Sequence, residues 1–220
     1  MSEATATQRA RILDPTERWA EILFGLIMVL TFTSSISAAE SGREDVRTML
    51  IGALGCNLAW GLVDAIMYLL NTLGLRGRGV VILRRLRRSS KPEEARRMIG
   101  DALPPVVTQV IRDEELDTLQ KRLVALPEPP ERAGFTRQDF LGALGIFLLV
   151  FLSTFPVVIP FFFVKEAHLA LRLSNAVAIA MLFLGGFSLA KYSGFVPWRT
   201  GLVMVVIGLA LVAITIALGG

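Results

Sequence analysis

Five long apolar runs, separated by polar segments, dominate the pattern of the chain. A membrane-spanning helix needs about 20 consecutive, mostly apolar residues, and each run approaches or exceeds that length. The runs occupy residues 19–39, 48–73, 140–164, 173–190 and 200–220. The pattern therefore predicts an all-α integral membrane protein with five transmembrane helices.

The polar segments divide the chain further. We expect a cytoplasmic tail over residues 1–18, two spans within 19–74, a small helical cytoplasmic lobe within the basic segment 75–136, and three spans within 137–220. Apolar and basic residues stand side by side over 80–88, which favours a stretch lying on lipid headgroups. A short helix is predicted to open near Pro92, and a second one over 105–126, where leucines recur at helical spacing.

The distribution of charge fixes the expected orientation. Of the 23 lysine and arginine residues, 19 fall on one side if the spans alternate, and the long segment between the second and third spans holds most of them. Lysine and arginine accumulate in cytoplasmic loops. We therefore expect a cytoplasmic N-terminus and an outer C-terminus, and we expect the membrane to be a bacterial inner membrane.

Composition excludes several classes of protein. A single cysteine, Cys56, allows no disulfide framework, and no catalytic motif is present, so we expect neither an enzyme nor a resident cofactor. No apolar stretch ending at a small-residue cleavage site follows the N-terminal tail, so we expect no removable signal peptide. The net charge of +4 fits anionic lipid at the basic residues 76–97, and no nucleic-acid partner is expected.

Asp64 is the first candidate for chemistry, because an ionisable residue inside the bilayer is costly and commonly faces a cavity, a partner or a pathway. Asn57, Asp64 and Asn71 are seven residues apart, and Tyr68 lies near the same polar face of the second span. This face predicts a cation or proton site. A structural interpretation stays open, in which Asp64 joins two helices through a hydrogen bond.

Three further features carry weaker hypotheses. Ser34 belongs to a stripe of small and hydroxyl residues on the first span, which either packs against a neighbour or lines a path. Pro156 and Pro160 lie inside the third span and predict a kink or an opening there. The acidic cluster at residues 113–117 either binds a metal or forms a solvated helix face.

The chain resembles a known family, the vacuolar iron transporters of the VIT1/CCC1 type. The layout of two helices, a cytoplasmic lobe and three further helices is similar throughout. Three local stretches are also similar to parts of that family: residues 92–103 to a helix of its metal-binding lobe, 155–160 to its proline-bearing third helix, and 182–186 to its fourth.

The resemblance implies a dimer that exchanges Fe²⁺ or a similar divalent ion for protons along a path beside the first helices. Met28 stands where the family carries an aspartate, and Met67 stands beside Tyr68, with Asp64 one turn away. Thioether and carboxylate groups both bind such metals. The implied metal ligands are Asp64, Met67 and Met28, and the implied pathway adds Tyr68, Asn57 and Ser34.

Two functions of different classes follow from these observations. The leading interpretation is a transmembrane transporter of a divalent metal ion of the Fe²⁺ or Mn²⁺ class, coupled to protons. The alternative is a membrane protein without transport, which acts as an anchor, a partner-binding subunit or a sensor. The intramembrane Asp64 favours transport, whereas the arginines at residues 84–88 favour the alternative.

Overall fold

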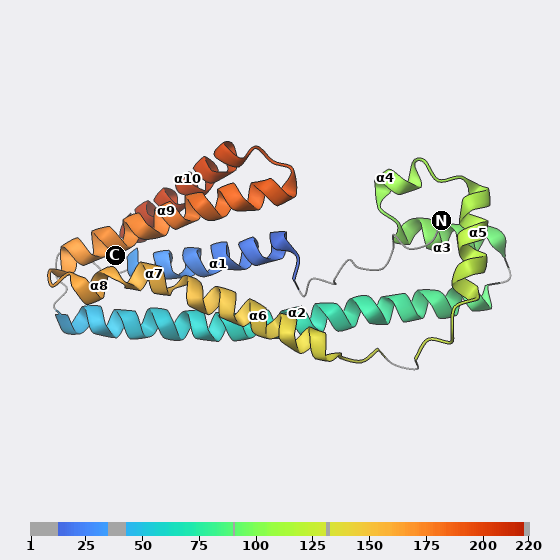
Figure 1. Ribbon diagram of the computed structural model, residues 1–220, viewed down its shortest axis with the longest axis horizontal. Helices are drawn as coiled ribbons and strands as arrows, with labels where there is room; N and C mark the ends of the chain where they lie inside the picture. Colours follow the sequence, from blue (N-terminus) through green and yellow to red (C-terminus); the bar gives the residue numbers. More distant parts are fainter. Residues whose placement is uncertain (1–12, 35–42, 90, 131–132, 218–220) are drawn as a thin grey trace, which may run out of the picture. The chain divides into compact units, whose positions relative to one another are not determined.

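The computed structural model describes residues 13–34, 43–89, 91–130 and 133–217, and within these ranges it is helical with no strand (Figure 1). The predicted all-α class is therefore confirmed. The helices are α1 (Pro15–Ser34), α2 (Arg43–Arg88), α3 (Pro92–Ala102), α4 (Pro105–Thr108), α5 (Asp113–Val124), α6 (Arg137–Ser153), α7 (Phe155–Val158), α8 (Pro160–Phe163), α9 (Ala167–Ser193) and α10 (Pro197–Ala217).

Among the described residues, four segments are long and apolar enough to cross a membrane. They are Leu50–Arg88, Arg137–Phe163, Ala167–Ser193 and Pro197–Thr215, and each contains or largely overlaps one of the expected spans. The first expected span begins in α1, but its residues 35–39 lie outside the described part of the chain. An integral membrane protein is thus supported, and the fifth span stays a prediction.

The helices form two compact units. One contains Met1–Tyr68 and Arg137–Gly220, and the other, called the lobe below, contains Leu69–Thr136.

In the first unit α1 is the inner helix. Its residues Leu26, Val29 and Leu30 are completely enclosed, and Figure 1 draws α1 between the α9–α10 pair and α6. The core around α1 takes Ala178 and Leu182 from α9. Since apolar side chains gain little from leaving lipid for protein, close packing must hold such helices together.

The third expected span is broken where the prolines predict a kink. Thr154 separates α6 from α7, and Ile159 separates α7 from α8. Pro156 and Pro160 lack the N–H that an uninterrupted helix would donate. The hydroxyl of Ser174 on α9 donates to the carbonyl of Val157 at 2.7 Å. The neighbouring helix therefore satisfies a backbone carbonyl at the break, as an apolar surrounding requires.

The helix that carries the second expected span does not end with the apolar run near Leu73. Helix α2 continues for 46 residues to Arg88, about 69 Å at 1.5 Å per residue. Its interior glycines cost only about 1 kcal/mol each in a helix. The residues 80–88 therefore extend a helix and do not form a separate stretch.

Arginines along α2 also hold the chain that returns from the lobe. Arg76 donates to the carbonyl of Gly134 at 2.9 Å, and Arg84 donates to that of Pro130 at 2.9 Å. Arg87 donates to the carbonyls of Leu126 and Pro127. These arginines therefore satisfy carbonyls of the proline-rich segment that follows α5.

The lobe has its own small core. Ala95 and Ile99 of α3 pack with Leu116 of α5 and Leu86 of α2. The prediction of one helix over 105–126 is wrong, because this segment forms two separate helices, α4 and α5. Helix α5 restarts at a capping box, in which Glu115 accepts from the backbone N–H of Arg112 at 2.8 Å, and β-branched residues disfavour helix just before it.

The acidic cluster of α5 has structural partners. The guanidinium of Arg96 on α3 donates to Asp117 at 2.7 and 2.8 Å and to Asp113 at 2.9 Å. Glu115 takes part in the capping box. The cluster therefore pairs α5 with α3.

This pairing predicts an acid-sensitive lobe. The Arg96 guanidinium holds the pKa of Asp117 below its ordinary value. The contribution of the Arg96–Asp117 pair to the stability of the lobe is therefore present above the ordinary carboxyl pKa and is lost as the pH falls through the lowered pKa. In the full-length protein in detergent, Asp117→Asn should lower the hydrogen-exchange protection of residues 92–124 at neutral pH and flatten its acid dependence. Glu114→Gln, an exposed change on α5, should leave both unaltered, and equal effects of the two variants would contradict the role of the pair.

Candidate functional site

Helices α1 and α2 meet along a seam with a fixed register. The side-chain amide of Asn57 donates to the carbonyl of Gly25 at 3.1 Å. The rings of Phe24 and Trp60 make an edge contact with centroids 6.0 Å apart. Residue numbers fall along α1 as they rise along α2, so the two helices run antiparallel.

Asn57 is the centre of this seam. It is completely buried, and its Nδ2 also donates to the Thr154 hydroxyl at 2.5 Å, at the break between α6 and α7. Its Oδ1 has no hydrogen-bond partner among the described residues. One side chain thus joins three separate segments and still holds an unused acceptor in an apolar surrounding.

Gly25 permits the close approach that Asn57 exploits. A Cβ at this position would lie 2.2 Å from the Ser153 hydroxyl oxygen and 2.6 Å from the Val150 carbonyl oxygen. Any larger residue would push α1 away from α6. The backbone of α1 is therefore within reach of α6 on one side and of Asn57 on the other.

Further along the seam, Asp64 on α2 lies near an acidic residue on α1, Glu21. The carboxyl group of Glu21 is close enough to that of Asp64 for their charges to interact, and both residues are half-buried. Glu21 was missed from the sequence because it lies at the start of the first apolar run, beside charged residues. Its spacing to Gly25 and Met28, four and seven residues, places it on the same face of α1.

The other predicted pathway residues occupy different places. Met28 is half-buried and lies about 10 Å along α1 from Glu21, two helical turns away. Tyr68 packs on α6, where its ring would meet a Cβ at Gly142. Met67 is 48% exposed, and Ser34 is buried with a hydroxyl that lacks a partner in the described ranges. Only Asp64 therefore has an ionisable group opposite it.

The described residues contain no group of three or more histidine, cysteine, aspartate or glutamate side chains that could hold a metal ion. The seam instead offers a pair of carboxylates, with a thioether further along α1. Two carboxylates close enough for their charges to interact repel one another, and a proton or a bound cation would relieve that repulsion. Such an arrangement suits temporary occupation better than a closed structural metal site.

Long apolar helices with a polar seam between two of them define a helical membrane protein with a candidate path for an ion. The sequence profile of the VIT family matches residues 91–220, which is more than half of the chain, and the protein belongs to this family. Membership indicates transport of metal ions across a membrane in general. The match covers α3 to α10 and leaves out the α1–α2 seam. A search of curated proteins found no match.

The role of Asn57 leads to a test of stability. Replacement by leucine removes the donor to Gly25 and Thr154, which should cost about 1–2 kcal/mol within a helix bundle. The thermal midpoint of the purified protein in detergent should fall by about 2–8 °C. Asn71→Leu, an exposed change on the same helix, is the matched control. Equal midpoints for wild type and Asn57→Leu would show that the seam does not depend on this bridge.

Proposed function

We propose that this protein carries a divalent metal ion of the Fe²⁺ or Mn²⁺ class through a membrane, with protons moving in exchange. The route follows the α1–α2 seam, and Asp64 with Glu21 forms its charged step. In this proposal α1 also crosses the membrane and brings the number of spans to five. The N-terminus is cytoplasmic and the C-terminus is outside. The protein works as a homodimer in a bacterial inner membrane.

The facing carboxyl groups of Asp64 and Glu21 carry the proposal. A divalent cation neutralises both carboxylates when it enters, and protons neutralise them when it leaves. The same pair can therefore exist with either occupant and stay uncharged overall. That exchange is the requirement for coupling the movement of a metal to the movement of protons.

The neighbouring groups suit a path of several steps. Met28 supplies a thioether, which favours softer ions such as Fe²⁺ over Mg²⁺ or Ca²⁺. The free Oδ1 of Asn57 offers a neutral oxygen between the levels of Met28 and Asp64. An ion that moves from the carboxylates towards Met28 would pass this oxygen on its way.

The lobe has a separate part in this proposal. Arg76, Arg84 and Arg87 hold the returning chain, whereas Arg85, Arg88 and Arg97 surround a polar cavity of about 560 Å³. These basic side chains would bind anionic headgroups at the membrane surface. The lobe would then anchor the protein on the lipid and would not collect the metal.

The test is metal uptake into proteoliposomes with Fe²⁺ and with Mn²⁺, with and without a pH gradient. Loss of one charged ligand costs about 1.5–3 kcal/mol, so Asp64→Asn and Glu21→Gln should each lower uptake by about 10- to 100-fold. Uptake by the wild type should rise when protons can flow in exchange.

Two controls keep the test specific. Glu114→Gln removes a carboxylate from the exposed face of α5 and should leave uptake unchanged. Each variant must elute from size exclusion as the wild type does, so that misfolding is not counted as lost transport. Wild-type uptake equal to that of empty liposomes would contradict the proposal and would favour an anchor, a partner-binding subunit or a sensor.

A further inference from the structure

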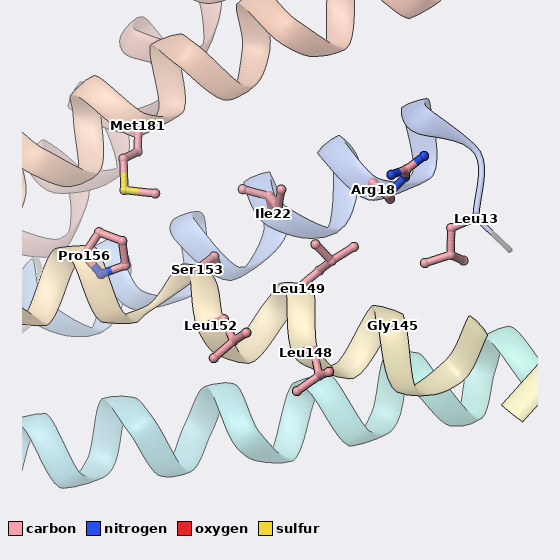
Figure 2. Close-up of a pocket in the computed structure, with 10 residues that line it drawn as sticks. All are labelled: Leu13, Arg18, Ile22, Gly145, Leu148, Leu149, Leu152, Ser153, Pro156 and Met181. Carbon is pink, nitrogen blue, oxygen red and sulfur yellow. The ribbon is translucent and has the colours of Figure 1, made fainter. Parts of the chain in front are cut away.

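A second feature of the first unit is an apolar cavity beside α1. A cavity of about 440 Å³ runs between α1, α6 and α9, within the roughly 300–1,000 Å³ of small-molecule sites. Figure 2 shows Ile22 of α1 facing Leu149 of α6, with Met181 reaching in from α9 and Pro156 near the same end. The lining is almost wholly apolar, and the cavity is open at the side.

The opposite end of this cavity is polar. Arg18 lies there in Figure 2, far from Pro156 and Met181. Arg18, Ile22 and Leu149 also line an adjoining cavity of about 500 Å³, together with Pro15, Trp19 and Tyr192. The two cavities therefore adjoin along these three shared residues and are together called the groove, which is apolar in one part and polar at the end near Arg18.

Arg18 has no ion pair or hydrogen bond from its side chain to any described residue, and it is exposed. Trp19 and Tyr192 stand beside it, and Lys191 lies over the Phe187 ring at 4.9 Å. Tryptophan and tyrosine gather at the level of lipid headgroups. The polar end of the groove therefore has the composition of a membrane boundary, with a cation that forms no ion pair with a described residue.

A ligand for this groove must have a long apolar part and an anionic end. A free phosphate would leave the apolar length empty, and a plain alkane would leave Arg18 unpaired. An arginine fork matches the paired oxygens of a phosphate. A phospholipid supplies both parts from the bilayer itself, and an anionic headgroup complements Arg18.

We propose that this groove is a binding site for one acyl chain of an anionic phospholipid, whose phosphate is held by Arg18. The chain lies along Ile22 and Leu149 and ends near Met181 and Pro156. This site is distinct from the carboxylate pair, because neither Glu21 nor Asp64 lines either cavity. Lipid binding here does not depend on metal transport.

The test is native mass spectrometry of the full-length protein, titrated with phosphatidylglycerol and with phosphatidylcholine of matched chains. The wild type should retain phosphatidylglycerol more tightly than phosphatidylcholine. Arg18→Gln should weaken the binding of phosphatidylglycerol by about tenfold, because one charge-assisted contact is lost. Arg199→Gln, an exposed arginine at the start of α10, should leave it unchanged.

Chain length gives a second measurement that needs no variant. Phosphatidylglycerol with eight-carbon chains should bind the wild type more weakly than its sixteen-carbon form, because a short chain leaves part of the groove unfilled. Equal binding of the two lengths would overturn the proposal, as would equal losses in Arg18→Gln and Arg199→Gln. A change of oligomeric state in Arg18→Gln with unaltered lipid binding would also overturn it and would assign the groove to a second copy of the chain.

Discussion

The first unit depends on one requirement, that a polar group inside an apolar bundle must find its partner within the protein. Asn57 meets this requirement by donating to the carbonyl of Gly25 and to the hydroxyl of Thr154. These two bonds fix α2 against α1 and against the break between α6 and α7. The break exists because proline cannot continue the hydrogen-bond ladder, so the bridge and the kink belong together. The same two bonds set the register of the α1–α2 seam, and this register brings Asp64 close to Glu21.

Much of this arrangement could be predicted from the sequence because membrane helices leave a strong pattern. Apolar length predicted five spans, four of which correspond to described helices long and apolar enough to cross a membrane. Pro156 and Pro160 predicted the break in one of these helices. The pattern failed where contacts distant in sequence decide the outcome. The end of α2 at Arg88 depends on carbonyls more than 35 residues further on, which accept from its arginines. The division between α4 and α5 depends on a capping box whose first residue, Arg112, is not a usual cap.

The candidate site was predictable in part for the same reason. The position of Asp64 within the apolar run and its separation of seven residues from Asn57 were visible along one helix. Glu21 could be recognised as a site residue only from the register between two helices. Tyr68 shared a face with Asp64 in the sequence pattern but packs on α6 beside Gly142. Helix α1 thus separates two kinds of chemistry, with carboxyl groups towards α2 and an apolar groove towards α6 and α9. A single inner helix can contact both regions because it has 3.6 residues per turn, so that successive side chains point in different directions around its axis.

The central claim is that Glu21 and Asp64 face one another on a route that a cation can enter, and metal bridging between introduced thiols tests it most directly. In a Cys56→Ser background, Glu21→Cys and Asp64→Cys would be made singly and together, and thiol labelling by a maleimide would be followed with and without Cd²⁺. The account predicts that Cd²⁺ protects both thiols in the double variant at concentrations that leave each single variant reactive. Equal labelling of the double and single variants in Cd²⁺ would show that the two positions do not share a cation, and would contradict the account.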